Sequence, residues 1–573
     1  MKFCFEKKDF IELDIEPNKL ALVGEDFELT WLEFKTKVNE TVDYFNTNGL
    51  KDLASPVIIY GHKSANMILA AYAMMKLNIA YIPVDEIYPK DRISKIINAA
   101  ECQLIINTTN ASLGIEKITE LLLSQDNFKL FNSLDTYKIE KNKVDPLVYI
   151  IFTSGSTGEP KGVQISTEAI QSFGRWMSSS DFGFTAGDTF INTALLSFDL
   201  SVFEVMTFGY IGGTLLLNSK KQCSDPNGLM NRINAYKGNI WVSTPSFALT
   251  YSRIEDTSRL VSIHTFLFCG EILPHPLAKT LLNNFPKAKV INTYGPTEAT
   301  VATTVINITP EIIEQYNPLP VGASKMESEL LIENKEIIIV GPNVSKGYVK
   351  NDTLNAEKFV TRKNQRAFKT GDNGYIKDNM LFFHGRNDDL VKLHGYRIEL
   401  NEITSCLNDL NCISQAETIA LKRNEVVKKI VSLVELKPNI EISKAEILDE
   451  LAKILPYYML PSDIKMVDKI PLIETKEKSR IVATVEFAHL IPGHHRAVGK
   501  KGVSYIDDFE ASRTSIDIKN MGAWRMASIP EKQTDIFQNS DLSNDIALGF
   551  KRAKLAWYTI DPLFFRSTSI TPP

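Results

Sequence analysis

Short apolar runs alternate with amphipathic stretches along the first part of the chain. VIIYGH (57–62) predicts a buried strand, an apolar helical stretch follows it, and NIAYIPVD (78–85) predicts the next strand. Upstream, Thr30 with Glu33 three residues later is a capping-box pattern that predicts a helix start. Strands separated by helices at this spacing are typical of βαβ units on a mainly parallel sheet. The expected fold class is therefore α/β.

The same pattern continues to about residue 300 and then changes. Apolar runs at 240–249, 265–274 and 289–292 predict further buried strands that end in loops. From 319 to 350 the runs are short and closely spaced, which predicts a small β-region. Strands are expected again near 417–436. Binding sites in open α/β sheets gather where strands end, so the loops after these strands are candidates for chemistry.

A loop rich in glycine and hydroxyl groups follows the predicted strand 147–152. Its sequence, TSGSTGEPKG, suits a nucleotide triphosphate, because glycines let backbone N–H groups turn toward an anion while hydroxyls and a lysine add donors and charge. It is not a P-loop, since Pro160 stands where that pattern has its second glycine. A plain surface loop is the alternative. The candidate phosphate-binding residues are Thr153, Ser154, Gly155, Ser156, Thr157, Gly158 and Lys161.

Asp199 is the one acid at the start of a mainly apolar run, Phe198 to Phe203. A carboxylate near a core is costly unless a cation or hydrogen-bond donors meet it. Asp199 therefore either caps a helix that begins at Leu200 or receives the ammonium group of a substrate.

A second candidate motif follows the predicted strand KVIN. A Tyr-Gly-Pro turn exposes Thr297 and Glu298, which offer a hydroxyl for a phosphate oxygen and a carboxylate for Mg²⁺. Taken alone, an ordinary strand-to-turn connection would also explain it. The motif comprises Asn292, Thr293, Tyr294, Gly295, Pro296, Thr297 and Glu298.

Composition excludes several functions. The 573 residues exceed one core, so we expect two or more domains. The net charge of −5 argues against a nucleic-acid binder. The apolar run near 64–75 is too short to span a membrane, and the N-terminus lacks an apolar signal core, so we expect a cytoplasmic protein. The six cysteines show no C-x-x-C pair and are expected to be free; Cys269, at a strand end, is either a small buried residue or part of a site.

Long motifs between about residues 15 and 470 resemble those of the adenylate-forming superfamily of acyl- and aminoacyl-activating enzymes. The strings TSGSTGEPKG, SFDLSVFEV, FCGEILP and NTYGPTEATVATT carry the resemblance, and they are most similar to the D-alanine–carrier-protein ligases. The resemblance implies a large N-terminal α/β domain with parallel sheets and a small β-region, a hinge, and a small α+β C-terminal domain. It also implies ATP and Mg²⁺ as cofactors, a small amino acid as substrate, and a phosphopantetheinylated carrier protein in trans as partner.

The resemblance further implies roles for single residues. Asp199 would pair with the α-amino group of the substrate, in a small pocket lined by Cys269 and Val301. Lys161 and Glu298 would be catalytic, with Glu298 holding Mg²⁺. Asp372 would grip the ribose hydroxyls. Asp388 would be the hinge, and the preceding residues Phe383, His384, Gly385 and Arg386 would face the nucleotide.

The chain departs from the family pattern near residue 475. The family has a segment resembling Asn-Gly-Lys-(apolar)-Asp-Arg, whose lysine contacts the substrate carboxylate and the α-phosphate, and Glu477 stands at the position of that lysine. Lys476 or Lys478 could substitute after a one-residue slip. We expect a large AMP-binding domain at 1–387, a small mobile domain with an altered end at 388–480, and a foreign tail at 481–573.

The tail has another character. Residues 486–573 are aromatic and turn-rich without helical periodicity, and they resemble an internal fragment of the very large gliding-motility and type IX secretion surface protein of Bacteroidetes-type bacteria. Such a fragment has no reason to fold alone, so we expect poor order, from a gene fusion or an assembly artefact near residue 480. Residues 1–480 are not expected to insert into a membrane. Two other functions fit the motifs: an adenylation module of a nonribosomal peptide synthetase, and an impaired fusion protein that only binds ATP.

Overall fold

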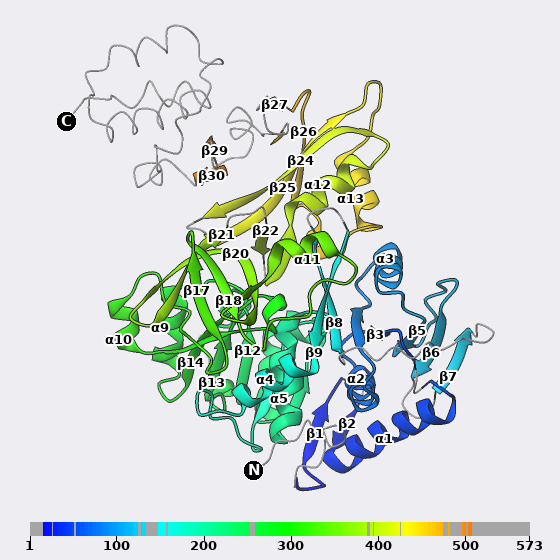
Figure 1. Cartoon of the computed structure of the whole chain (residues 1–573), viewed down its shortest axis with the longest axis vertical. Helices are drawn as coiled ribbons and strands as arrows, with labels where there is room; N and C mark the ends of the chain where they lie inside the picture. Colours follow the sequence, from blue (N-terminus) through cyan, green and yellow to red (C-terminus); the bar gives the residue numbers. More distant parts are fainter. Residues whose placement is uncertain are drawn as a thin grey trace. The chain divides into compact units, whose positions relative to one another are not determined.

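The chain divides into two compact units, one up to Arg397 and one from Ile398 onward (Figure 1). The sequence analysis placed a domain boundary after residue 387, and the segment up to 397 belongs to the first unit. The structure, a computed structural model, describes residues 15–25, 27–50, 53–123, 128–132, 147–155, 159–252, 258–386, 390–393, 395–423, 426–470, 472–473, 480–481, 495–499 and 502–506.

A nine-stranded sheet forms the larger half of the first unit. Its six central strands run parallel, and antiparallel strands flank them on both sides. In spatial order the strands are β16 (Ala323–Ser324), β15 (Thr304–Ile308), β14 (Lys289–Tyr294), β13 (Thr265–Phe268), β12 (Ile240–Ser243), β10 (Thr189–Asn192), β11 (Thr214–Leu217), β1 (Leu20–Val23) and β2 (Glu28–Thr30).

The expected strands at 240–249 and 265–274 are shorter than the apolar pattern predicted. The strand β12 ends at Ser243, and a helix, α8 (Pro245–Ser252), begins two residues later. Proline suits the first position of a helix because its missing N–H has no partner there. An apolar run alone does not separate a strand from a buried helix start, which explains the difference.

A seven-stranded sheet forms the other half of the first unit. The expected strand–helix–strand pattern is present as β3 (Val57–Gly61), α2 (Ala65–Leu77) and β4 (Tyr81–Asp85), with β3 and β4 parallel. The predicted α/β class is thus confirmed. In spatial order the strands are β7 (Phe128–Asn132), β6 (Thr119–Leu123), β5 (Leu104–Asn107), β3, β4, β8 (Leu147–Thr153) and β9 (Lys161–Ser166).

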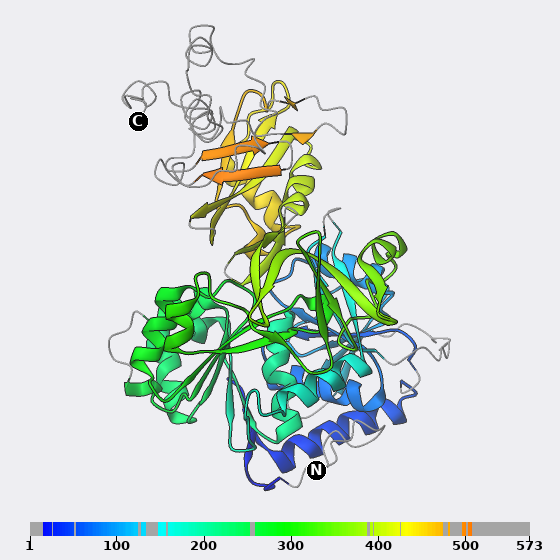
Figure 2. The same cartoon turned by 60° about the vertical axis from the view of Figure 1, so that its left-hand side comes forward.

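Helices cover the sheets of the first unit (Figure 1, Figure 2). One apolar core spans both sheets and joins Ile59 and Ile151 of the seven-stranded sheet with Leu215 and Ile240 of the nine-stranded sheet. A second core, with Trp241, lies on the other face of the nine-stranded sheet. The remaining helices are α1 (Trp31–Thr47), α3 (Lys90–Ala100), α4 (Thr167–Met177), α5 (Val202–Ile211), α6 (Lys220–Ser224), α7 (Pro226–Ala235), α9 (His275–Asn284), α10 (Pro310–Gln315) and α11 (Asp352–Lys358).

Local capping defines the start of α1 as the sequence predicted. The Thr30 hydroxyl accepts the Glu33 backbone N–H, and the Glu33 carboxylate accepts the Thr30 backbone N–H at 2.8 Å. The capping box therefore satisfies two donors that a helix start would otherwise leave open.

Lys63 fastens the two large sheets to one another. It follows β3 of the seven-stranded sheet, and its buried ammonium group donates to the carbonyl oxygens of Thr193 and Asn218, each at 2.7 Å. These two residues directly follow β10 and β11 of the nine-stranded sheet. Burial lowers the pKa of Lys63, while the nearby Cys223 and Glu204 act to raise it.

A small antiparallel sheet completes the first unit, as the short runs from residue 319 predicted. It comprises β17 (Glu329–Glu333), β18 (Glu336–Val340), β20 (Gln365–Lys377) and β19 (Phe359–Arg362), with β21 (Met380–Arg386) paired to β20. The hairpin of β22 (Leu390–Leu393) and β23 (Tyr396–Glu399) follows.

The second unit is a smaller α+β arrangement. Its three-stranded sheet has β24 (Ile413–Arg423), β25 (Val426–Leu436) and β26 (Asp463–Met466), and its helices are α12 (Leu400–Asn408) and α13 (Lys444–Ala452). Further pairs are β27 (Leu472–Ile473) with β28 (Arg480–Ile481), and β29 (His495–Gly499) with β30 (Gly502–Ile506). Most of the predicted tail, 481–573, lies outside the described residues, so its expected lack of order stays a prediction.

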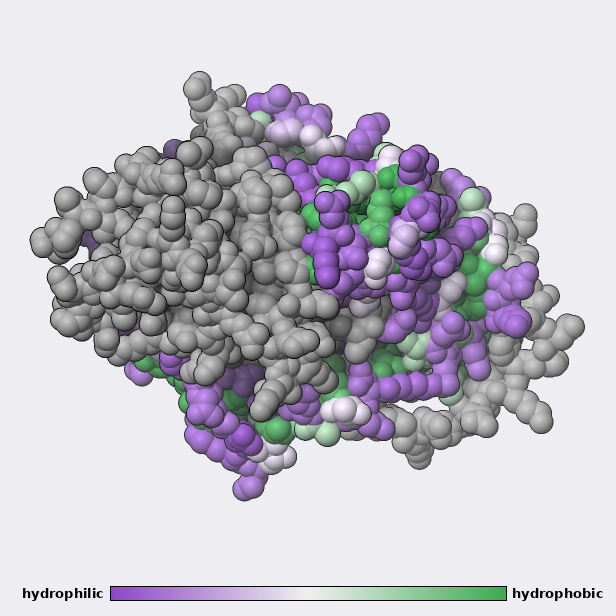
Figure 3. All heavy atoms as spheres, turned by 90° about the horizontal axis from the view of Figure 1, so that it is seen from above, coloured by the Kyte–Doolittle hydropathy of each residue, from purple (hydrophilic) through white to green (hydrophobic). Residues whose placement is uncertain are grey.

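The described surface is mostly polar. On the face seen in Figure 3, hydrophilic side chains predominate and apolar ones form small areas between them. Large exposed hydrophobic residues such as Leu32, Val261 and Met326 are scattered along the chain. Among the described residues, no helix is long and apolar enough to cross a bilayer. The five cysteines in the described ranges are free thiols, as predicted.

Replacing Lys63 with methionine should destabilise the first unit. The substitution leaves the Thr193 and Asn218 carbonyl oxygens without their ammonium donor, and each buried acceptor left unsatisfied costs about 1–3 kcal/mol. We expect a loss of about 2–4 kcal/mol in the free energy of unfolding, measured by urea titration. Lys363→Met, at an exposed lysine paired with Glu329, is the control and should change it by less than about 0.5 kcal/mol. Equal effects of the two substitutions would contradict the role of Lys63.

Candidate active site

The predicted phosphate loop connects β8 to β9, which form an antiparallel hairpin with Thr153 opposite Lys161. The Thr153 hydroxyl donates to the Lys161 carbonyl oxygen at 3.5 Å. A side chain at Gly155 would place its Cβ 1.9 Å from the Glu159 carbonyl oxygen, so only glycine fits there. Ser154 is buried at the start of the loop. Ser156, Thr157 and Gly158 lie outside the described residues, so their part in phosphate binding stays a prediction.

The predicted ribose-binding group comes together at the end of β14. Asp372 is buried and accepts a hydrogen bond from the Tyr294 hydroxyl at 2.6 Å and an ion pair from Arg386. The rings of Tyr294 and Phe383 lie with their centroids 6.0 Å apart. His384 next to them is exposed. Gly385 has φ +98°, a backbone conformation that favours glycine.

The other residues of the second motif hold the turn after β14 in place. Asn292 donates to the Pro320 carbonyl oxygen at 2.9 Å, and Thr293 donates to that of Phe268 at 2.8 Å. A Cβ at Gly295 would come within 2.5 Å of the Ala302 backbone. Pro296 precedes the short helix η3 (Thr297–Ala299).

Asp199 does not cap a helix. It opens the short helix η1 (Asp199–Ser201), and neither η1 nor α5 after it has a side-chain capping bond. Its carboxylate instead accepts a hydrogen bond from the Thr297 hydroxyl at 2.6 Å. Burial raises the pKa of Asp199, while that hydrogen bond and the Arg397 charge act to lower it. A carboxylate buried in this way is stabilised when a cation binds next to it.

Cys269 and Val301 lie beside one another, and the Asp199 charge acts on Cys269. Cys269 directly follows β13, and its thiol donates to the Val301 carbonyl oxygen at 3.9 Å. Burial raises the pKa of Cys269, with a further upward contribution from the Asp199 charge. The thiol is therefore a small, neutral lining group rather than a nucleophile.

Val301 has an uncommon backbone conformation. Both Thr300 and Val301 have positive φ values, 55° and 70°, which β-branched residues rarely adopt. Asn343 holds this turn: its carbonyl oxygen accepts from the Thr300 hydroxyl at 2.7 Å, and its amide donates to Ala299 at 3.0 Å. Backbone strain of this kind persists only where the surroundings enforce it, and it clusters at functional sites.

Glu298 is fully buried and has two partners in this structure. One carboxylate oxygen accepts from Arg397 at 2.7 Å, and the other accepts from the Tyr348 hydroxyl at 2.7 Å. Burial would raise the pKa of Glu298, but the Arg397 charge and the hydrogen bonds from Arg397 and Tyr348 outweigh it and lower the pKa to about 2. In this arrangement the carboxylate does not fit the predicted role of Mg²⁺ ligand, because a guanidinium group faces it. Among the described residues, no cluster of three or more His, Cys, Asp or Glu could hold a metal ion.

The sequence analysis missed Arg397 and Glu271. Arg397 and Gly395 lie in the hairpin of β22 and β23, and the sequence analysis assigned no role to either residue. Gly395 donates its backbone N–H to Glu271 at 2.6 Å, and the Arg397 carbonyl oxygen accepts from the Ser154 hydroxyl at 2.9 Å. The signal in the sequence was an arginine, Arg397, two residues after the turn glycine Gly395, in a chain whose candidate site residues include several acids.

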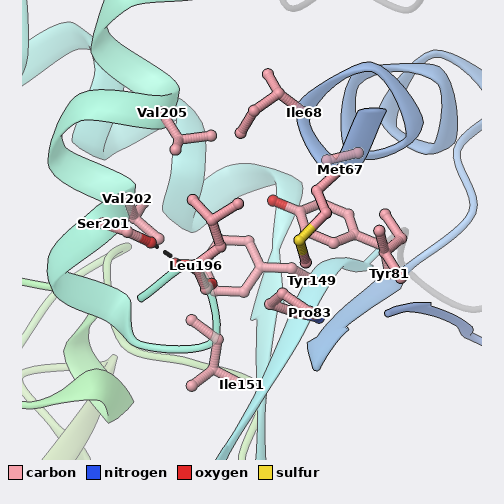
Figure 4. Close-up of a pocket in the computed structure, with 12 residues that line it drawn as sticks. Met67, Ile68, Tyr81, Pro83, Tyr149, Ile151, Leu196, Ser201, Val202 and Val205 are labelled. Atoms are coloured by element: carbon pink, nitrogen blue, oxygen red, sulfur yellow. Dashed lines mark hydrogen bonds between the residues drawn. The ribbon is translucent and has the colours of Figure 1, made fainter. Parts of the chain in front are cut away.

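An apolar pocket lies behind η1 (Figure 4). The Tyr149 hydroxyl is buried there, and among the described residues it has no hydrogen-bond partner. The residues that line the pocket are Ile59, Met67, Ile68, Ala71, Tyr81, Pro83, Tyr149, Ile151, Leu196, Ser201, Val202 and Val205.

Three further predicted site residues cannot be placed. The hinge residue Asp388 and the lysines Lys476 and Lys478 lie outside the described residues. The strands β27 and β28 on either side of the two lysines pair with one another, with Leu472 opposite Ile481. Which lysine serves the reaction stays a prediction.

Known proteins resemble this chain over most of its length. Residues 12–349 match the family described as AMP-binding enzyme. The chain is 36% identical over 484 residues to the D-alanine–D-alanyl carrier protein ligase of Bacillus cytotoxicus, a match that covers 80% of this chain and 94% of the relative. The ligase of the same name from Bacillus cereus strain Q1 is also 36% identical over the same shares of both chains.

Solved structures share the fold. The Vibrio cholerae adenylation domain AlmE, in complex with glycyl-adenosine-5′-phosphate, has a TM-score of 0.67 and 20% identity over 81% of this chain and 93% of its own. NpsA-ThdA, an artificially fused adenylation–PCP di-domain from Klebsiella oxytoca, has a TM-score of 0.67 and 20% identity over 78% and 91%. The predicted adenylate-forming fold is thus confirmed. The resemblance predicted for residues 486–573 is not shown by these matches and stays a prediction. The family match and the ligases together show that this chain belongs to the AMP-binding enzyme family.

Proposed function

We propose that this enzyme activates a small amino acid, D-alanine, with ATP and then transfers it to the phosphopantetheine thiol of a separate carrier protein. The names of the relatives at 36% identity support the substrate and the carrier. The observation that carries the proposal is the position of Asp199, a carboxylate with raised pKa that accepts the Thr297 hydroxyl and whose charge acts on Cys269, which in turn contacts Val301. An ammonium group bound there would add a cation to the Thr297 hydrogen bond and the Arg397 charge that already act on this carboxylate.

In the first step, a carboxylate oxygen of the amino acid bonds to the α-phosphorus of ATP, and the bond from that phosphorus to the pyrophosphate oxygen breaks. Little covalent help is required, so positioning and charge neutralisation by the protein supply most of the rate. Asp199 would hold the substrate ammonium, and the loop 153–161 would hold the phosphates. Asp372 would orient the ribose from β20.

The nucleotide base also has a candidate partner. The Asn292 amide oxygen is buried and, among the described residues, has no hydrogen-bond partner. A buried acceptor without a donor is costly, and an exocyclic amino group of adenine would satisfy it. Asn292 lies in the same strand, β14, as Tyr294, whose hydroxyl donates to Asp372, the proposed ribose-binding carboxylate.

In the second step, the carrier thiol attacks the carbonyl carbon of the aminoacyl adenylate, the carbon–sulfur bond forms, and AMP leaves. The sequence shows no carrier-type serine motif, so we propose a carrier in trans. We further propose a cytoplasmic location, which free thiols at Cys102, Cys223, Cys269, Cys406 and Cys412 fit.

Pyrophosphate exchange with a panel of acids tests this function against its two rivals. Exchange that prefers D-alanine over L-alanine and glycine supports the proposal. A preference for another amino acid would favour a peptide-synthetase adenylation module. Calorimetric binding of ATP without any exchange would favour an impaired ATP-binding protein.

Replacing Asp199 with asparagine should abolish the preference for amine-bearing acids. The amide keeps the size of the side chain and can still accept the Thr297 hydrogen bond, but it removes the negative charge. Losing one partner of a desolvated charge pair costs about 2–5 kcal/mol, so we expect exchange with D-alanine to fall by roughly 100-fold in kcat/KM. Asp352→Asn, at an exposed helix start, is the control. If the ratio of activities with D-alanine and propanoate stayed as in the parent enzyme, the assigned role of Asp199 would be wrong.

Restoring the family lysine should accelerate the first step. Loss of one preorganised charge at a transition state typically costs about 3–4 kcal/mol, so we expect slow adenylation in the natural chain. The triple substitution Thr475→Asn, Lys476→Gly and Glu477→Lys should raise pyrophosphate exchange by roughly 100-fold or more. Transfer from supplied aminoacyl adenylate should change much less. Glu477→Gln alone controls for loss of the negative charge; fast exchange in the natural chain would contradict the premise.

A further inference from the structure

The pairing of Glu298 with Arg397 conflicts with the metal role predicted for Glu298. Arg397 donates to one carboxylate oxygen at 2.7 Å; the side chain of Glu298 is 0% exposed and that of Arg397 is 19% exposed, so solvent screens the pair only weakly. Mg²⁺ demands oxygen ligands at about 2.0–2.1 Å in near-octahedral geometry. A guanidinium group at the same carboxylate blocks part of that coordination sphere and repels a second cation.

The position of Arg397 is set by several independent contacts of its hairpin. The Gly395 backbone N–H donates to Glu271 at 2.6 Å, and the Arg397 carbonyl oxygen accepts from Ser154 at 2.9 Å. The Tyr396 ring packs edge-on against Phe198, with centroids 5.1 Å apart.

The tip of this hairpin fits closely against β12. Gly395 has φ +83°, and a Cβ there would come within 2.5 Å of the Thr244 side chain. Only glycine therefore lets the hairpin approach this far. Together with the contacts at Glu271 and Ser154, this close fit makes the pairing of Arg397 with Glu298 part of a defined arrangement.

We propose that Arg397 and a divalent cation are alternative partners of Glu298, so that the docked hairpin and the bound cation exclude one another. The inference rests on the proposed function, in which MgATP is used only in the first step. In the absence of the cation, the buried Glu298 carboxylate would still need a positive partner, and the Arg397 guanidinium group would be that partner, as it is in this structure. Arg397 thereby acts as a positioning residue that couples the absence of the cation to docking of residues 395–397.

Binding of Mn²⁺, a spectroscopic substitute for Mg²⁺, tests this exclusion without requiring turnover. Free Mn²⁺ is measured by electron paramagnetic resonance on the full chain saturated with α,β-methylene ATP, which cannot form the adenylate. Arg397→Met should tighten Mn²⁺ binding by at least tenfold, because Glu298 is then open to the cation. Adding Glu298→Gln to this variant should remove the gain, which locates it at Glu298. Unchanged Mn²⁺ affinity in Arg397→Met would overturn the proposal.

A second variant leaves both members of the ion pair intact. Glu271→Ala removes the acceptor of the Gly395 backbone N–H, weakens docking of the hairpin, and should also tighten Mn²⁺ binding, by roughly threefold to tenfold. The matched control is Arg362→Met, which breaks an arginine–glutamate pair with Glu333 in the small sheet and should leave Mn²⁺ affinity unchanged.

The proposed substrate and the proposed exclusion between Arg397 and a cation can be refuted independently of one another. Preference for an acid other than D-alanine in pyrophosphate exchange would refute the substrate but not the exclusion, because Mn²⁺ affinity does not depend on which acid is activated. Weaker Mn²⁺ binding in Glu271→Ala would overturn the exclusion even if Arg397→Met failed to fold.

Discussion

Removing carboxylates from water is the physical requirement around which this site is built. Glu298 and Asp372 are fully buried and Asp199 is partly buried, and each accepts hydrogen bonds from a hydroxyl group, an arginine or both. A buried carboxylate without such partners would protonate or destabilise the fold. The donors come from other segments of the chain, so the site forms only when the first unit is complete.

The predicted site residues come from both large sheets. The predicted phosphate loop belongs to the seven-stranded sheet, through the hairpin of β8 and β9. Cys269 directly follows β13 of the nine-stranded sheet, and the 292–298 motif begins inside β14 and continues past its end. Thr297 links parts of the second group by donating to Asp199, so an amino-acid residue and a nucleotide motif share one hydrogen bond. Its predicted contact with a phosphate oxygen would require that hydroxyl to share or change its partner.

Much of this fold could be predicted from apolar runs and the loops after them. The strands β3, β4 and β14 lie where the pattern placed them, because fully buried parallel strands are continuous apolar runs. Once these strands are identified, the residues that directly follow strands, such as Cys269, are identified as well. The end of β12 was predicted too far along, because an apolar run does not show where a strand gives way to a buried helix.

The partners of the site residues could not be predicted. Thr297 lies 98 positions from Asp199, and Arg397 lies 99 positions from Glu298, so no local pattern joins them. The left-handed backbone at Val301 was equally hidden, since β-branched residues normally avoid it and the buried Asn343 amide that enforces it comes from a distant loop. The sequence motifs identified most of the site residues, whereas the tertiary fold determines which of them form hydrogen bonds and ion pairs with one another.

The bond from Lys63 to the ends of β10 and β11 has a consequence for evolution of the enzyme. If the phosphate groups and the amino acid are held by different sheets, as proposed, a tilt of one sheet against the other would change the angle of attack at phosphorus without altering any residue that touches a substrate. Substitutions in the interior, at positions such as the packed rings of Tyr72 and Phe208, would then adjust turnover while the proposed binding residues stay fixed.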